Sequence, residues 1–165
     1  MKNKRIILIV LVVLFSIGCD QVSKSVARNN INDNEIIHIL KDNLAFTNVE
    51  NNGAAFGLGV DSPLFLKIFY LQLIPISILL FLFRMIVTDT EFSKLTIIGT
   101  ALVIGGAFGN ILDRMLYRSV TDFIKLNIGV NKTIIFNVAD ILVVLGMFLV
   151  IVDLIINYNK KKVSS

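Results

Sequence analysis

The sequence predicts an all-α membrane protein built around four transmembrane helices. Three observations lead to this prediction. Of the 165 residues, 55% are hydrophobic and only 17% are charged, with a mean hydropathy of +0.79. The apolar residues gather in four long segments, and basic residues gather at the ends of segments. A water-soluble domain of this length carries more charge, so we expect one folding unit, residues 1–165, that lies in lipid.

The four predicted spans cover approximately residues 6–26, 63–87, 95–112 and 138–157. Each approaches the roughly 20 residues that a helix needs to cross a hydrocarbon core. The third span is the shortest and the richest in glycine. Because small residues allow helices in lipid to approach closely, we expect this span to pack tightly against its neighbours.

An even number of spans places both chain ends on the same side of the membrane. Both ends are basic, through Lys2, Lys4, Arg5, Lys160, Lys161 and Lys162. Basic residues favour the cytoplasmic side, so we expect both termini in the cytoplasm. The connection between the third and fourth spans is also basic, which opposes this orientation, but the agreement of the two ends outweighs it. Residues 27–62 and 113–137 are then the outer connections.

The first outer connection contains a predicted β-hairpin. Ile36–Leu40 and Leu44–Val49 are β-prone runs, and Lys41-Asp42-Asn43 between them is a turn signal. Residues 51–57 follow as a segment of mostly small residues. We therefore expect a small hairpin or sheet on the outer surface.

Several classes of protein are excluded by composition. Cys19 and His38 are the single cysteine and the single histidine, so neither a disulfide within the chain nor a cysteine or histidine metal cluster is expected. The net charge of +4 is not gathered on a basic face with aromatic residues, which argues against nucleic-acid binding. The segment from Met1 to Cys19 is similar to a lipoprotein signal peptide. Because three further spans follow, we expect Cys19 to pack within the first helix.

The first span ends in a charged pair. Asp20 and Lys24 are four residues apart, so on a helix they share a face and can pair. One interpretation is a neutral ion pair that anchors the helix end. The other is that the pair organises a polar site below the outer surface, as ionisable groups inside membranes usually do.

The third span ends with Asn110, Asp113 and Arg114. Asn110 and Arg114 are four residues apart and therefore face the same way. Arg114 is placed to pair with a lipid phosphate or with a carboxylate of a site. The alternative is that its side chain simply extends to the membrane surface, with Asp113 as a neutralising partner.

Two further aspartates flank the second outer connection. We place Asp122 in a loop, and Asp140 at the start of the fourth span with Asn137 three residues before it. Taken alone, Asp140 is explained by the helix dipole and Asp122 by a solvated loop. If the two meet near the bilayer surface, the pair suits hydrolysis by an activated water. Metal binding by these residues together with Asp113 has no support from the sequence.

Five segments resemble the motifs of the bacterial signal peptidase II family of aspartic membrane proteases. In chain order they are Asp20–Lys24, Asn51–Gly57, Gly105–Arg114, Val120–Phe123 and Phe136–Asp140. The resemblance covers essentially the whole chain. It implies a four-helix protein of the bacterial cytoplasmic membrane with an outward-facing β-cradle and a second extramembrane arm. It also implies cleavage of the signal peptide from diacylglyceryl-modified prolipoproteins, immediately before the lipidated cysteine.

The resemblance also implies roles for individual residues. Asp122 and Asp140 match the catalytic pair at the outer face. The positions that bind substrate or support the site are matched by Asp20, Lys24, Asn51, Gly53, Asn110, Asp113, Arg114, Asn137 and Ala139. Thr121 departs from the family pattern, which usually has valine there, but threonine has a similar shape. Asp113 is also a motif aspartate and is the rival for the catalytic role.

The expected mechanism needs only two carboxylates and water. Two nearby carboxylates do not both ionise readily, so they share a proton. One acts as general base on water, and the other polarises the scissile carbonyl and protonates the leaving amine. We expect no metal and no cofactor. The expected partners are the diacylated prolipoprotein and membrane lipid, with the protein as a monomer.

Two alternatives belong to other classes of protein. One is a small four-span proton-coupled transporter with Asp20 as its proton site. Such a site is expected near the midplane of the bilayer, whereas the acids here lie toward the outer ends of the spans. The other alternative is a structural subunit without chemistry, which would tolerate Asp140→Asn.

Overall fold

The computed structural model describes residues 2–41, 43–53, 59, 61–128 and 132–163. Four helical stretches in this part of the chain are long and apolar enough to cross a membrane: Asn3–Asn30, Leu64–Thr88, Lys94–Tyr117 and Val138–Lys160. A small antiparallel sheet accompanies them. The predicted fold class of four apolar helices with a small β-structure is therefore confirmed.

The second span is assembled from three helical elements. They follow one another directly as α2 (Leu64–Ile68), a π-helix η2 (Phe69–Leu73) and α3 (Ile74–Thr88). The other spans are single α-helices, namely α1 (Lys2–Asn30), α4 (Lys94–Tyr117) and α5 (Val138–Val163).

The helix α4 continues beyond the predicted span end at Leu112, as far as Tyr117. Arg118 then adopts a left-handed conformation with φ of 65°, which ends the helix. Asp113 and Arg114 consequently lie in the last turns of α4 and not in the outer connection that follows.

α4 is the central helix, and it lies against α1, α3 and α5. Its glycines make this possible. A methyl group built on Gly99 would lie 2.7 Å from the carbonyl oxygen of Gly146 in α5, and one on Gly106 would lie 2.6 Å from the carbonyl oxygen of Ala139. These positions accept only glycine at the observed helix separation, in keeping with the packing expected for the glycine-rich span.

The sheet has four antiparallel strands in the order β1-β2-β3-β4. The strands are β1 (Ile36–Leu40), β2 (Leu44–Asn51), β3 (Val120–Asn127) and β4 (Thr133–Phe136). β1 and β2 form the hairpin that the sequence predicts. β3 pairs with β2, so both connections contribute to one sheet. Residues 54–57 of the predicted small-residue segment lie outside the described residues.

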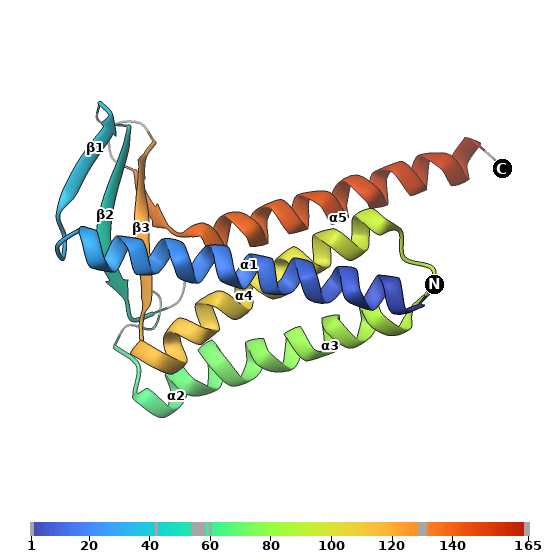
Figure 1. Cartoon of the computed structure of the whole chain (residues 1–165), viewed down its shortest axis with the longest axis horizontal. Helices are drawn as coiled ribbons and strands as arrows, with labels where there is room; N and C mark the ends of the chain where they lie inside the picture. The colour runs from blue at the N-terminus through green and yellow to red at the C-terminus, as the bar shows by residue number, and fades with distance from the viewer. Residues whose placement is uncertain (1, 42, 54–58, 60, 129–131, 164–165) are drawn as a thin grey trace.

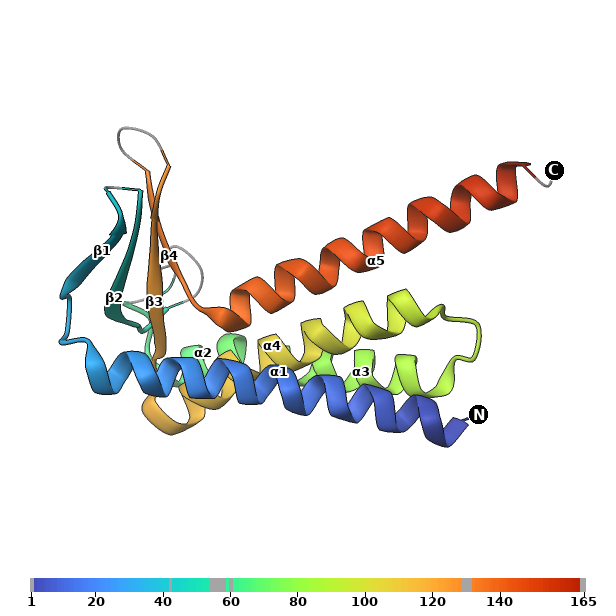
Figure 2. The same ribbon diagram turned by 45° about the horizontal axis from the view of Figure 1, so that its top comes forward.

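The sheet lies at one end of the helices, and both chain termini lie at the other (Figures 1 and 2). The outer faces of the helices carry large apolar side chains that are more than half exposed, among them Leu11, Phe15, Phe81, Phe148 and Leu154. Such exposure is costly in water and favourable in lipid, which fits a bundle surrounded by a bilayer.

Candidate active site

Asp122 lies in the strand β3, where it pairs with Val49 of β2. It is only 6% exposed. Asn51 Nδ2 donates to its Oδ2 at 3.0 Å, and Asn137 Nδ2 donates to its Oδ1 at 2.6 Å. Burial raises the pKa of Asp122 to about 6, and the negative charge of Asp140 acts in the same direction against the hydrogen bonds. The side chain is therefore a carboxyl group that retains a proton more readily than a solvated one.

The prediction that Asp122 lies in a loop was wrong. The run Val120–Ile124 is largely β-branched and aromatic and pairs with β2, and the strand pairs with β4 from Ile124 onward. A solvated loop carboxylate is excluded by the burial of this residue.

Asp140 lies in the first turn of α5 and is held by a reciprocal pair of hydrogen bonds. The backbone N–H of Asp140 donates to Asn137 Oδ1, and the backbone N–H of Asn137 donates to Asp140 Oδ2, both at 3.1 Å. This is a capping box, which satisfies two helix-end donors at once. Asn110 Nδ2 of α4 donates to the other oxygen of Asp140 at 2.9 Å.

Asn137 joins the two predicted catalytic aspartates. Its side-chain amide reaches Asp122 while its backbone amide reaches Asp140. The two carboxylates, far apart in sequence, are thereby attached to a single residue. Their electrostatic coupling is one reason for the raised pKa of Asp122.

Beneath this pair lies a buried ion cluster. Lys24 is fully buried, and its Nζ donates to Asp20 Oδ2 at 2.8 Å and to Asn110 Oδ1 at 2.7 Å. The expected pairing of Asp20 with Lys24 is therefore present. The other oxygen of Asp20 accepts from the backbone N–H of Ala139 at 2.9 Å. Because Asn110 binds both Lys24 and Asp140, the cluster is connected directly to the start of α5.

Asp113 is fully buried and belongs to the same cluster. Its Oδ2 lies 3.2 Å from Lys24 Nζ and 3.0 Å from Arg28 Nη2. The backbone N–H of Thr121 and the side chain of Gln21 also donate to it. Both oxygens are thus occupied by cations and donors, which is the arrangement of a structural ion pair.

Three residues of this cluster were not assigned roles from the sequence. Gln21 and Arg28 bind Asp113, and the Thr121 hydroxyl accepts from Arg28 Nε at 2.7 Å and donates to Glu50 Oε1 at 2.7 Å. The helical spacing offered a signal for Arg28, because it lies four residues after Lys24 on the same face of α1.

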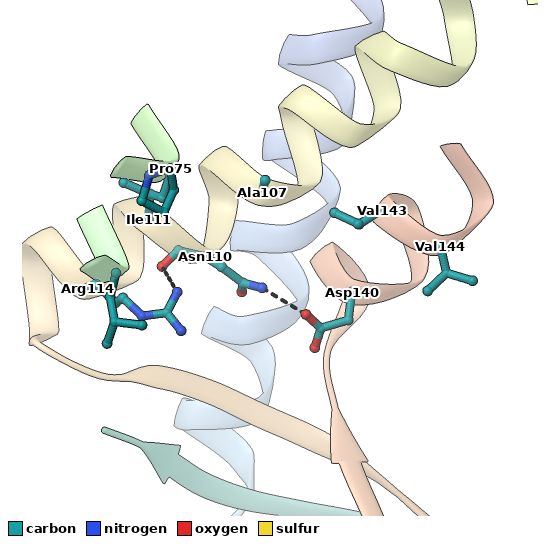
Figure 3. A pocket seen from close by; sticks show the side chains of 9 residues that line it. Pro75, Ala107, Asn110, Ile111, Arg114, Asp140, Val143 and Val144 are labelled. Atoms are coloured by element: carbon teal, nitrogen blue, oxygen red, sulfur yellow. Dashed lines mark hydrogen bonds between the residues drawn. The ribbon is translucent and has the colours of Figure 1, made fainter. Parts of the chain in front are cut away.

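Arg114 and Gly53 meet at the edge of a pocket. Arg114 Nη2 donates to the Gly53 carbonyl at 3.1 Å, and Nη1 donates to the Asn110 carbonyl at 3.3 Å. The pocket has a volume of about 330 Å³, and Asp140 faces it together with Arg114 and Asn110. Figure 3 shows Asn110 between the other two side chains. The remaining lining residues are apolar: Leu71, Pro75, Ala107, Ile111, Val143 and Val144.

All the site residues expected from the sequence therefore gather at the sheet end of the helices. The described residues contain no group of three or more His, Cys, Asp or Glu side chains that is placed to hold a metal ion. A half-buried carboxylate beside an apolar pocket, coupled to a buried one, is an arrangement suited to acid–base chemistry on a bound peptide.

A family model described as signal peptidase (SPase) II matches residues 11–156. The chain belongs to the signal peptidase II family. It is a membrane aspartic peptidase, and the transporter interpretation is not favoured.

Relatives of this signal peptidase II family member match it over nearly their whole length. The lipoprotein signal peptidase of Clostridium tetani (strain Massachusetts / E88) is 36% identical over 94% of this chain and 99% of its own. The lipoprotein signal peptidase of Clostridium novyi (strain NT) is 34% identical over 88% of this chain and 96% of its own. The lipoprotein signal peptidase of Staphylococcus aureus (strain Newman) is 32% identical over 93% of this chain and 91% of its own.

Solved structures give the same result for the fold. Two bacterial membrane enzyme structures, obtained by the in meso method at 2.3 and 1.9 Å resolution, are each 30% identical to this chain. Their TM-scores are 0.78 and 0.73, and the matches cover 96% and 92% of this chain and 92% of each structure. The signal peptidase II family thus accounts for the sequence and for the arrangement of the helices and sheet.

Proposed function

We propose that this signal peptidase II family member cleaves the signal peptide from diacylglyceryl-modified prolipoproteins, immediately before the lipidated cysteine. Asp122 and Asp140 are the catalytic pair. The observation that carries this assignment is Asn137, which hydrogen-bonds both carboxylates. The names of the relatives support the substrate class.

With substrate bound, Asp122 is the member that holds the proton, and Asp140 is the general base. Its burial raises the pKa of Asp122 to about 6, so it takes up a proton more readily than an ordinary carboxyl group, whereas Asp140 is half-buried and faces the pocket. Entry of an apolar substrate segment removes more water and strengthens this preference.

The reaction then needs one water. Asp140 takes a proton from the water, whose oxygen attacks the carbonyl carbon of the scissile peptide bond. Asp122 donates a hydrogen bond to the carbonyl oxygen and then gives its proton to the departing nitrogen as the C–N bond breaks. The products are a signal peptide with a new carboxylate and a lipoprotein with a new amino-terminal cysteine.

The surrounding residues position these groups. Asn51 and Asn110 orient the carboxylates, and the Asp20 contact to the Ala139 N–H fixes the start of α5. Arg114, held by the Gly53 carbonyl, supports the bound peptide backbone. The apolar pocket wall receives the end of the signal helix, and such positioning supplies up to about 7–11 kcal/mol of the barrier.

The proposal includes an orientation in the membrane. The termini lie in the cytoplasm and the sheet and active site lie at the outer face, in agreement with the basic chain ends. The diacylglyceryl chains stay in lipid while the peptide bond is held at the surface. The enzyme acts as a monomer in contact with membrane lipid and requires no cofactor.

Cleavage of a synthetic diacylated prolipoprotein by the detergent-purified protein tests the proposal. Asp122→Asn and Asp140→Asn should each lower the rate by about 10²–10⁴-fold, because each removes a proton-transfer group. Asp153→Asn is a matched control, since this buried aspartate accepts from Ser93 and Thr96 away from the site and should leave cleavage in place.

Circular dichroism should show that all variants are folded. The assignment of the pair is refuted if Asp122→Asn cleaves normally while a folded Asp113→Asn does not. The proposed activity itself is refuted if the folded wild type leaves intact a substrate that a Clostridium tetani relative cleaves.

A further inference from the structure

A second cavity adjoins the active-site pocket. Its volume is about 160 Å³, and Arg114 and Leu71 line both cavities. Lys67 of α2 and Arg118 after α4 also line the second one, together with Gln72. The other lining residues are Asn52, Leu64, Ile68 and Met115. Three cations and no carboxylate therefore line this space, which we call the basic cleft.

Arg114 makes no ion pair among the described residues, and its charge acts both on the active-site aspartates Asp122 and Asp140 and on the basic cleft that it lines. Its two hydrogen bonds go to the backbone carbonyls of Asn110 and Gly53, and neither acceptor carries a formal charge. Its Nε is buried and, among the described residues, has no hydrogen-bond partner. A buried donor of a charged group without a protein acceptor is able to bind an atom of a ligand.

Arg118, the second cation of the basic cleft, lies at a helix end where arginine is uncommon. Arg118 has φ of 65°, the left-handed conformation in which helices usually end with glycine or asparagine. A residue with a β-carbon is disfavoured there, and Arg118 is exposed and makes no ion pair among the described residues. Termination of α4 does not require an arginine here, and its unpaired charge is free to bind an anion in the cleft.

The depth of the basic cleft points to the source of the anion. Lys67 lies in the first turn of one apolar span, and Arg118 directly follows the last residue of another. Ends of spans lie where hydrocarbon gives way to lipid headgroups. The cleft also has an apolar side formed by Leu64, Ile68 and Met115, against which an acyl chain can pack.

We propose that the basic cleft binds the phosphate group of an anionic membrane phospholipid. Arginine and lysine groups hold phosphate oxygens by charge-assisted hydrogen bonds, and basic pockets between membrane helices bind anionic headgroups. The diacylglyceryl group of the proposed substrate contains no phosphate, so this lipid is a separate ligand. Free phosphate has the same chemistry and is the competing source of the anion.

Lipid binding is tested with a variant that removes the two cations not assigned to the active site. Lys67→Gln/Arg118→Asn lowers the charge by two, and asparagine suits the left-handed position. Lys41→Asn/Lys125→Gln is the matched control. Lys41 also has a positive φ, 44°, and lies in the turn between β1 and β2, and Lys125 lies in β3. Native mass spectrometry in neutral detergent then measures retention of phosphatidylglycerol and of phosphatidylcholine.

The wild type and the control variant should retain phosphatidylglycerol in preference to phosphatidylcholine. Lys67→Gln/Arg118→Asn should bind phosphatidylglycerol about tenfold more weakly and phosphatidylcholine unchanged, because only the anionic headgroup interacts with the lost charges. Equal retention of phosphatidylglycerol by this variant and the wild type, with both folded, overturns the proposal.

Inorganic phosphate, added in a separate arm, distinguishes the two sources. If millimolar phosphate displaces phosphatidylglycerol completely, the cleft is a site for free phosphate and the lipid proposal is overturned. If the lipid persists, the acyl chains contribute and the proposal is supported. The measurement involves no peptide cleavage, so its outcome is independent of the proposed catalytic pair.

Discussion

The raised pKa of Asp122 predicts an unusual pH dependence of stability. The perturbation is Asp122→Asn, which removes the ionisable group while keeping its shape. Asparagine also presents an NH₂ group where the amides of Asn51 and Asn137 now donate, which destabilises the fold by about 1–3 kcal/mol at every pH. Only the pH-dependent part of the stability difference reports the carboxyl group.

The magnitude follows from the pKa itself. Burial raises the pKa of Asp122 from its ordinary value of 3.8 to about 6. The folded state therefore binds this proton more tightly than the unfolded state does. The resulting stabilisation is fully present below about pH 4 and is lost as the pH rises through 6. A shift of about 2 units corresponds to about 3 kcal/mol.

Thermal unfolding in detergent at several pH values between 4 and 8 measures this difference. The stability of Asp122→Asn relative to the wild type should rise by about 3 kcal/mol across the range, or about 6–12 °C in Tm. Asp61→Asn, at an exposed position, is the control. If the difference between Asp122→Asn and wild type stays constant from pH 4 to 8, the carboxyl group is not perturbed and the reasoning is refuted.

Two further predictions concern packing around the ion cluster. Lys24→Met leaves the buried carboxylate of Asp20 without its cation and removes one of the two cations beside Asp113, and it should lower the free energy of unfolding by about 3–5 kcal/mol. An unchanged Tm would show that the cluster is solvated. Gly109→Ala places a methyl group against the carboxylate of Asp20, 3.0 Å from its Cγ, and should cost about 1–3 kcal/mol with reduced cleavage. A methyl group added at Gly18 meets no atom within 4 Å, so the control Gly18→Ala should be neutral or slightly stabilising. Equal stability of the two alanine variants would contradict the close approach of α1 and α4.

The sequence predicted those features that depend on local geometry. The pairing of Asp20 with Lys24 follows from helical spacing alone, and the hairpin of β1 and β2 follows from two β-prone runs around a turn. The contact of Lys24 with Asp113 depends on how α1 and α4 pack, which no local pattern encodes.

Asp122 shows where local reasoning was insufficient. The strand β3 is stabilised by pairing with β2, and residues such as Phe46 and Ile124 that face each other are far apart in the chain. A polar aspartate between apolar residues resembled a loop because its partners, Asn51 and Asn137, lie on other elements. The family motifs pointed to the residue as part of the site, which stays a prediction, and they carried no information on its burial.

The junction of the sheet and the fourth span has a mechanical consequence. β4 ends at Phe136 and α5 begins at Val138, so Asn137 alone connects them. Because the connection is so short and β3 pairs with β4, we expect the sheet and the first turn of α5 to move together. Asp122 belongs to the sheet and Asp140 to the first turn of α5, so the two carboxylates lie on the same unit. We therefore expect the separation of the two carboxylates to be kept when the far ends of the helices move.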